Sequence, residues 1–400
     1  MPTDLLAADR LLDGPAADDL LADVVRRSGG QLHRARLRSV HHRGGRSLSR
    51  VFDVTIEAQD TVRDVLLVLH VDARRPPPEA PLLHVEGVPV SVWRFPRDPY
   101  LPGLPSAVHR GRVRELLDAL GAPPGSVRLR TRAYRPTRRA VVEVTIDGSG
   151  PSRGTGRVLY LKVLEPRRAG ELADTHRQLV SQVPVPRVIG VGAEQGIVAL
   201  EALAGQRLRD AVVSGAALPD PWELVALTDR FATCDLDAKQ DPRRFADATR
   251  HVGLLSRLVP EAAERVARVA RHTRSLHGPL RAVHGDLHDG QLLVVDATVS
   301  GLIDVDGAGP GLIAEDAGRL VAHLQVLADL HPGAAERITA YADAVARAFA
   351  QSVGDQELAW GTAAAWLGLA TGPHRAQDPG WAASTRRRIE RAEQALTPWW

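Results

Sequence analysis

The most reactive-looking segment of the chain is a run of polar residues, HGDLHDGQ, at positions 284–291 between two apolar stretches. Asp286 follows a glycine turn, where a carboxylate exposed to a cleft can accept the proton of a hydroxyl group. A second run, IDVDGAGPG, places Asp304 at the end of a short apolar strand. The amide oxygen of Gln291 and the carboxylate of Asp304 suit Mg²⁺, a hard cation whose shell substrate phosphates complete. The two loops therefore predict phosphoryl transfer.

The elements that must position these loops change in character along the chain. Residues 127–203 are mostly strand-like, since VRLRTRAY, RAVVEVTI and RVLYLKVL alternate or run β-branched, and one helical stretch, RRAGELADTHRQLV, follows them. From about residue 206 onward, apolar residues recur at helical spacing of three and four. A sheet followed by helices predicts an α+β protein with two lobes.

The first third of the chain contains segments that weakly resemble the strands of this sheet. The stretch that ends at Ile56 resembles the one that ends at Ile146, and VLLVLHV resembles VLYLKV about 90 residues later. A duplicated three-strand meander would leave this pattern, and in that case His70 stands where Lys162 stands in the second copy. We therefore expect an N-terminal α/β cap domain (1–108), a nucleotide-binding N-lobe (109–203) and a helical C-lobe (204–400).

The paired motifs HGDLHDGQLL and IDVDGAGPG…EDAGRL resemble those of the aminoglycoside phosphotransferase family, over roughly residues 127–396. The resemblance implies a protein-kinase-like fold, ATP and Mg²⁺ as cofactors, Asp286 as the catalytic aspartate, and Asp304 as the principal Mg²⁺ ligand. It also implies a structural role for Asp316. The family has asparagine where this chain has Gln291, and the chain contains no asparagine. A similar loop occurs in maltokinases and related sugar kinases, which indicates that subgroup.

The nucleotide half should contribute a cation to the phosphates. Lys162 lies on an apolar strand in a chain that has only one other lysine among its 51 basic residues, and a compact ammonium group suits that task. By analogy with kinases, its partner is an acid on the following helix, and we favour Glu171 over Asp174. The stretch VALEALAG resembles the family's linker, and this resemblance implies that backbone groups near Glu201 and Leu203 bind the adenine.

The acceptor is expected to be a small sugar or amino sugar, of the maltokinase or glucosamine kinase type. Gln291 and the extra N-terminal domain favour this prediction. The side chains expected near the acceptor favour it as well. Few of them are acids that could pair with the ammonium groups of a polycation, and several are aromatic residues that could stack on a sugar ring. The aromatic residues are Trp360, Trp366 and Trp381, of which Trp366 is expected in the core. The remaining acids are Asp306, Glu315, Asp316 and Asp378.

Two alternatives remain open. The first is an aminoglycoside O-phosphotransferase, and the second is a nucleotide-binding pseudokinase or regulatory module. The joint presence of Lys162, Asp286 and Asp304 counts against the second, because a module that only binds has no need of a base.

Composition excludes other classes of protein. The formal charge is only +3 with scattered basic residues, which does not suggest a nucleic-acid partner, and no apolar run is long enough to predict a membrane span. The acidic N-terminus does not read as a signal peptide, so we expect a cytoplasmic protein. A single cysteine, Cys234, excludes an internal disulfide framework. His284 and His288 are four residues apart, but we expect them to support the loop and expect no metal besides Mg²⁺.

Overall fold

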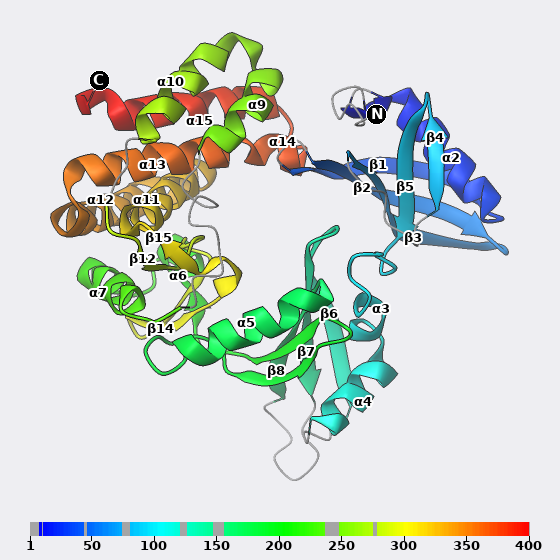
Figure 1. The fold of residues 1–400 in the computed structure, drawn as a ribbon, viewed down its shortest axis with the longest axis horizontal. Helices are drawn as coiled ribbons and strands as arrows, with labels where there is room; N and C mark the ends of the chain where they lie inside the picture. The colour runs from blue at the N-terminus through cyan, green and yellow to red at the C-terminus, as the bar shows by residue number, and fades with distance from the viewer. Residues whose placement is uncertain are drawn as a thin grey trace. The chain divides into compact units, whose positions relative to one another are not determined.

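The computed structural model describes residues 8–9, 11–43, 46–73, 81–120, 126–146, 156–236, 248–274 and 278–399. The chain forms two compact units (Figure 1), which are described separately below. Unit 1 comprises residues 1–170, 190–199 and 373–381, and unit 2 comprises residues 171–189, 200–372 and 382–400. The division into three domains at residues 108/109 and 203/204 stays a prediction.

The N-terminal part of unit 1 is an antiparallel sheet with one helix. Helix α2 (Pro15–Arg27) precedes the strands, and the strand order is β1-β2-β3-β5-β4. Alternating apolar residues of the strands pack with Leu21 of α2 into a core that includes Leu48 and Leu69. The strands are β1 (Gln31–Arg43), β2 (Ser47–Ala58), β3 (Thr61–Asp72), β4 (Leu82–Val85) and β5 (Val88–Arg94).

A second sheet has the same topology. Helices α3 (Leu104–Ala107) and α4 (Arg110–Ala119) precede it, and its strand order is β6-β7-β8-β10-β9. Helix α5 (Pro166–Leu179) stands between β8 and β9, and the boundary between the two units falls within it. The strands are β6 (Val127–Arg135), β7 (Arg139–Ile146), β8 (Arg157–Leu164), β9 (Val188–Gly192) and β10 (Ile197–Glu201).

The two sheets match in register as well as in order. His70 is the third residue from the end of β3 and pairs with Ser49, the third residue of β2. Lys162 is likewise third from the end of β8 and pairs with Val141, the third residue of β7. The expected equivalence of His70 and Lys162 is therefore present in the strand pairing, which supports the predicted duplication of the meander. The cap role expected for the first copy stays a prediction.

Unit 2 is mainly helical, and its short strands carry the loops singled out in the sequence. Strands β13 (Leu292–Val295) and β14 (Thr298–Leu302) form a hairpin that β11 (Gln206–Arg207) extends, while β12 (Arg281–Val283) pairs with β15 (Gly309–Gly311). The helices are α6 (Leu208–Ser214), α7 (Pro221–Ala232), α9 (Thr249–Leu258), α10 (Ala263–Thr273), α11 (Ile313–Leu330), α12 (Ala335–Val353), α13 (Asp355–Ala370), α14 (Gly372–Ala376) and α15 (Trp381–Leu396), with single 3₁₀ turns at Pro260–Ala262, Val305–Gly307, Pro332–Ala334 and Thr397–Trp399.

Helix α11 packs against α13 at a glycine contact. A Cβ atom at Gly318 would lie 2.2 Å from the backbone carbon of Gly361, and a Cβ at Gly361 would lie 2.0 Å from the carbonyl oxygen of Ala314. No side chain larger than hydrogen fits at either position, so these glycines set the approach of the two helices. Trp366 of α13 is 1% exposed and belongs to the helical core, as the sequence indicated.

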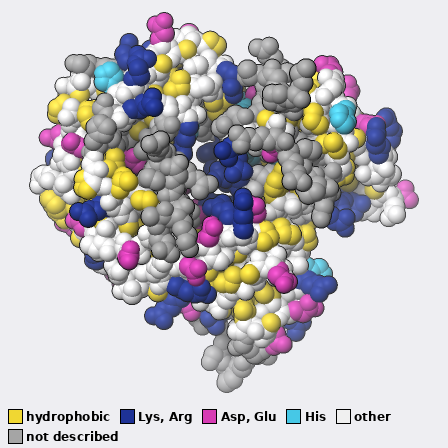
Figure 2. All heavy atoms as spheres, in the orientation of Figure 1, with side chains coloured by type: hydrophobic (Ala, Val, Ile, Leu, Met, Phe, Trp, Pro, Cys, Tyr) yellow, Lys and Arg dark blue, Asp and Glu magenta, His cyan; other side chains and the backbone are white. Residues whose placement is uncertain are grey.

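The predicted α+β organisation is confirmed by these sheets and helices. Within the described part of the chain, every helix is too short or too polar to cross a bilayer. Acidic and basic side chains are interspersed over much of the face shown in Figure 2.

Candidate active site

The predicted catalytic loop, residues 284–291, connects β12 to β13, and its glycine adopts the turn expected from the sequence. Gly285 has a φ of +75°, a conformation that side chains rarely adopt, and the turn places Asp286 with its side chain 46% exposed. The expected base therefore reaches solvent while the residues on both sides of it are buried.

Two buried side chains hold this loop in place. Asp316, in the first turn of α11, accepts hydrogen bonds from the backbone N–H groups of His284 at 2.7 Å and Gly285 at 3.0 Å. His284 accepts the N–H of Asp286 at Nδ1 (3.2 Å), and its Nε2 lies 2.9 Å from the carbonyl oxygen of Ile303, to which it donates. Both ring nitrogens of His284 are thus occupied by backbone groups. This geometry agrees with the supporting role expected for His284 and the structural role expected for Asp316.

A positive charge lies beside Asp286. Nη1 of Arg319, on α11, lies 3.6 Å from Oδ1 of Asp286. Desolvation by itself would raise the pKa of Asp286, but its charged surroundings, Arg319 foremost, outweigh it and hold the pKa below its ordinary value. Asp286 is therefore ionised at neutral pH and can accept a hydroxyl proton during the reaction.

The expected magnesium ligands lie side by side because a hairpin joins them. Leu292 pairs with Leu302 at the base of β13 and β14, so the residues just outside this pair face each other. The N–H of Ile303 donates to the carbonyl of Gln291 at 2.9 Å, and Nε2 of Gln291 donates to Oδ2 of Asp304 at 3.2 Å. The side chains of Gln291 and Asp304 are thus in direct contact although the residues are 13 positions apart in the sequence.

This donor pair suits a hard cation. Asp304 adopts a left-handed conformation (φ +67°, ψ 43°), which ends the strand and turns its carboxylate toward the amide of Gln291. A half-turn of that amide about its terminal torsion would exchange nitrogen for oxygen and give two oxygen donors at one place. One carboxylate, one amide oxygen and the phosphates of a substrate form a typical Mg²⁺ shell. The residues present therefore fit the ion expected from the sequence.

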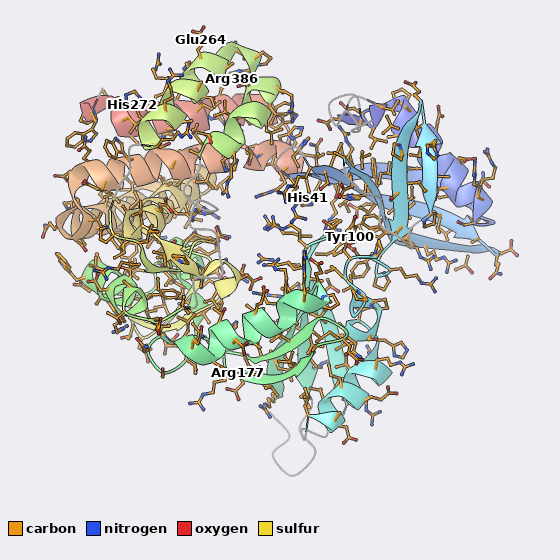
Figure 3. All side chains as sticks on the ribbon, viewed as in Figure 1. His41, Tyr100, Arg177, Glu264, His272 and Arg386 are labelled. Atoms are coloured by element: carbon orange, nitrogen blue, oxygen red, sulfur yellow. The ribbon has the colours of Figure 1, made fainter. Side chains whose placement is uncertain are left out.

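The residues expected to bind the nucleotide lie in both units. Lys162, on β8 of unit 1, is 6% exposed. In unit 2, Glu171 and Asp174 are both exposed on α5, and Asp174 pairs with Arg177 at 2.8 Å (Figure 3 labels Arg177). The carboxylate of Glu171 has no such neighbour among the ion pairs of the described residues, which is compatible with the preference for Glu171. Whether it pairs with Lys162 stays a prediction.

The expected adenine linker leads from β10 into unit 2. Glu201 ends β10, and its N–H donates to the carbonyl of Arg187 at 3.0 Å. Leu203 is half-buried, and the carbonyl oxygen of the next residue accepts the Ser300 hydroxyl at 2.8 Å. The linker is therefore fastened to the hairpin that carries Gln291. Its contact with adenine stays a prediction.

Sequence reasoning missed several residues close to the loop. Arg319 and His323 come from α11, and Asp289 lies inside the loop motif itself but was given no role. A signal was available, because positions 316, 319 and 323 share one face of a helix at spacings of three and four. Asp316 was already tied to the loop by its motif, so its helical neighbours at those spacings were candidates.

Comparison with known protein families identifies the family to which the chain belongs. The model of a family described as "Phosphotransferase enzyme family" matches residues 154–363, just over half of the chain. No curated protein matches the chain. The match agrees with the predicted kinase-like fold. ATP and Mg²⁺ remain the cofactors expected from the sequence.

Several solved structures are similar to the chain at low identity. Aminoglycoside phosphotransferase APH(4)-Ia, in a ternary complex with ADP and hygromycin B, is 14% identical, with a TM-score of 0.49 over 71% of this chain and 98% of that one. Aminoglycoside 2′-phosphotransferase IIIa, in complex with GDP, is 15% identical, with a TM-score of 0.44 over 72% and 99%. Aminoglycoside 3′-phosphotransferase of type VIII is 21% identical, with a TM-score of 0.40 over 62% and 96%.

Proposed function

The chain belongs to the phosphotransferase enzyme family, and from this premise we propose that it transfers the γ-phosphate of ATP to a hydroxyl group of a small-molecule acceptor, with Asp286 as the base. In this proposal Gln291 and Asp304 hold Mg²⁺, and Lys162, Glu171, Glu201 and Leu203 bind the nucleotide. The observation that carries the proposal is the side-chain contact between Gln291 and Asp304, in the hairpin that follows the loop of Asp286. A pseudokinase is less well supported, because the base and both ligand candidates are present.

Arg319 adds a charge that suits this reaction. Its guanidinium lies beside Asp286, where the transferred phosphoryl group must pass if Asp286 accepts the hydroxyl proton. In the transition state, the transferred phosphoryl group carries its negative charge on three oxygens. Catalysis therefore consists mainly of positioning the reactants and neutralising this charge. Arg319 would stabilise that charge and orient the base at the same time.

The aminoglycoside alternative is better supported for the acceptor than the sugar. The similar solved structures are aminoglycoside phosphotransferases, and they include complexes with hygromycin B and kanamycin. The aromatic residues that favoured a sugar are engaged elsewhere. Trp366 is core, Trp360 packs against the same core, and Trp381 makes an edge contact with His374 at a ring distance of 4.8 Å. These contacts engage part of the aromatic surface on which the sugar prediction relied.

The acids considered for the acceptor are partly engaged as well. Asp316 binds the catalytic loop, and Glu315 is 7% exposed. Asp306 is half-buried and lies two residues after Asp304. Asp316 and Glu315 would therefore contribute little to the binding of an aminoglycoside, which would depend more on the ionised Asp286.

The experiment that separates these acceptors is an ADP-release assay with purified protein, ATP and Mg²⁺. Hygromycin B and kanamycin are compared with glucosamine and maltose, and Asp286→Asn serves as the control for background ATP hydrolysis. We expect acceptor-dependent ADP release with at least one aminoglycoside. A higher kcat/KM for glucosamine or maltose would restore the sugar prediction, and no release with any hydroxyl acceptor would contradict the proposed reaction.

A further inference from the structure

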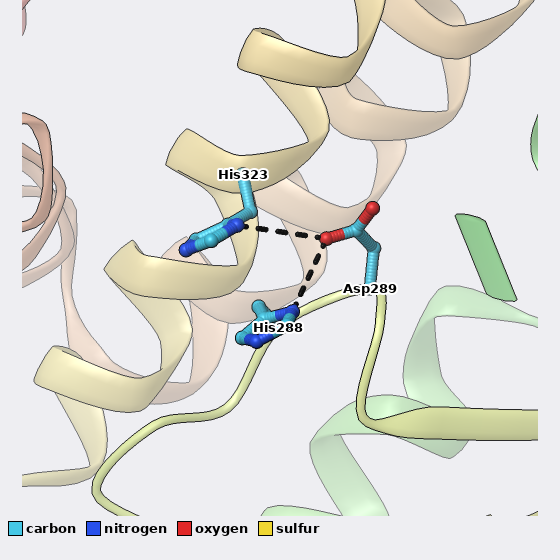
Figure 4. Close-up of side chains that lie close together, drawn as sticks. All are labelled: His288, Asp289 and His323. Atoms are coloured by element: carbon cyan, nitrogen blue, oxygen red, sulfur yellow. Dashed lines mark ion pairs between the residues drawn. The ribbon is translucent and has the colours of Figure 1, made fainter. Parts of the chain in front are cut away.

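A second group of potential metal ligands lies next to the proposed magnesium site. His288 and Asp289, from the catalytic loop, meet His323 of α11, and one donor atom from each lies within 4.8 Å of the others (Figure 4). Oδ1 of Asp289 is 3.5 Å from Nδ1 of His288 and 3.7 Å from Nδ1 of His323. Both contacts are longer than a hydrogen bond between these atoms.

The buried carboxylate of Asp289 is only half satisfied. The side chain is fully buried, and its Oδ2 accepts a hydrogen bond from Nε of Arg209 at 3.1 Å. Its Oδ1 is also buried but has no hydrogen-bond partner among the residues that the structure describes. A buried carboxylate oxygen without a hydrogen-bond donor from the protein is costly, because no protein donor replaces the hydration it loses. A cation between Asp289 and the two imidazoles would supply the missing partner.

The two distances from Asp289 are close to those in the shell of a small tetrahedral ion. Nitrogen and oxygen ligands about 2.0–2.2 Å from Zn²⁺ stand roughly 3.3 Å from one another in a tetrahedral shell. The two distances from Asp289 exceed this value by a few tenths of an ångström. Two imidazoles and one carboxylate suit Zn²⁺ better than Mg²⁺, which prefers oxygen ligands only.

From this juxtaposition we propose that His288, Asp289 and His323 bind one Zn²⁺-class ion, separate from the Mg²⁺ of the proposed reaction. Three protein ligands leave a fourth position for water. Arg209 orients the carboxylate from outside, as the outer partners of metal ligands do. The ion would tie the catalytic loop to α11 through His323.

The ring of His323 is in the right protonation state for a metal ligand, but the pair of imidazoles must adjust in orientation. Burial lowers the pKa of His323 to about 3, so its ring is neutral at pH 7. The two rings are stacked, with centroids 4.3 Å apart and planes 10° from parallel, so one must turn for both lone pairs to meet the ion. His323 makes no hydrogen bond among those described, and the terminal torsion of histidine is soft, so this ring is the one that turns.

The ion would also act on the neighbouring magnesium ligand. Nδ1 of His288 accepts a hydrogen bond from the N–H of Gly290 at 3.0 Å, which the ion would replace. Nε2 of the same ring lies 3.1 Å from Nε2 of Gln291. Coordination of His288 therefore fixes the ring against which the amide of Gln291 is placed.

Metal binding to untagged, chelator-treated protein tests the proposal without any activity measurement. Zn²⁺ is titrated in competition with a chromophoric chelator, and Co²⁺ is added separately to record its visible absorption. We expect one Zn²⁺ per chain, retained in millimolar Mg²⁺, and the intense bands of tetrahedral Co²⁺. His323→Gln should weaken Zn²⁺ binding at least tenfold and abolish these bands.

The matched control is His331→Gln, since His331 is an exposed histidine at the end of the same helix. This variant should bind Zn²⁺ as the unchanged protein does. Asp289→Asn provides a second ligand variant, and thermal unfolding in chelator verifies that each variant folds. Equal Zn²⁺ affinity of the His323 and His331 variants, or no stoichiometric binding to the unchanged protein, would overturn the proposal.

Discussion

The carboxylate of Asp316 holds the backbone of His284, 32 residues earlier in the chain, through a 2.7 Å hydrogen bond from the His284 N–H. Its second oxygen takes the N–H of Gly285, so one buried side chain fixes the start of the catalytic loop. The first turn of α11 and the loop of Asp286 therefore move as one piece, and changes in either are expected to affect the other.

Replacement of Asp316 by alanine should destabilise the protein. It leaves the buried N–H groups of His284, Gly285 and Leu287 without an acceptor, at a cost of about 1–3 kcal/mol each, so we expect a loss of at least about 3 kcal/mol. Urea unfolding measures this loss. Asp329→Ala, on the exposed end of the same helix, removes a surface ion pair with Arg391 and should cost under about 1 kcal/mol. Equal losses in the two variants would contradict the anchoring role.

Asp286→Asn should abolish most turnover and leave nucleotide binding intact. Loss of a general base lowers kcat by a factor on the order of 10² or more, whereas the half-exposed side chain contributes little to folding. Steady-state ADP release gives kcat, and fluorescence titration with a nucleotide analogue gives the affinity. A parallel fall in affinity and turnover would show that Asp286 binds the nucleotide instead.

Arg319→Gln is expected to lower kcat by a factor on the order of 10², because a neutral amide cannot stabilise the charge of the transferred phosphoryl group. Arg319→Lys keeps a positive charge and should recover part of this loss. The KM for ATP should change little in both variants. If glutamine and lysine reduced kcat equally, the contribution of Arg319 would lie in packing rather than in charge.

Gln291→Ala should raise the Mg²⁺ concentration needed for half-maximal activity, since it removes one proposed ligand. Gln291→Asn keeps an amide oxygen on a side chain one methylene shorter, and we expect partial tolerance. The measurement is activity against free Mg²⁺ at saturating nucleotide. An unchanged Mg²⁺ titration of the alanine variant would exclude Gln291 from the metal shell.

Glu315 should make stability depend on pH. Burial and the neighbouring Asp316 raise its pKa from 4.5 to about 7 in the folded protein. The folded state therefore binds the proton more tightly than the unfolded state, and this contribution to stability is present below pH 4.5 and lost as pH rises toward 7. Glu315→Gln cannot ionise, so its stability relative to the unchanged protein should rise by up to about 3 kcal/mol between pH 4.5 and 8.

Urea unfolding at pH 5 and pH 8 measures this difference. Glu336→Gln, at an exposed position on α12, is the matched control and should show no such dependence. A constant difference between the Glu315 variant and the unchanged protein across this range would show that Glu315 is ionised in both states.

The sequence by itself determined the parts of this protein that depend on local pattern. Alternating strands and helical spacing predicted the α+β order, and the echo between the two meanders predicted the matching registers of His70 and Lys162. The proximity of Gln291 and Asp304 could also be predicted from the sequence, because a short hairpin lies between them and brings its two ends together whatever else surrounds it.

Tertiary structure alone decided which distant side chains meet the catalytic loop. Apolar spacing shows that one face of α11 is buried, but not that Arg319 and His323 face Asp286 and Asp289. That placement depends on the rotation and approach of the helix, which are set where Gly318 meets Gly361 on α13. Such contacts join residues far apart in the chain, so their geometry follows from the packing of whole elements and leaves no period in the sequence.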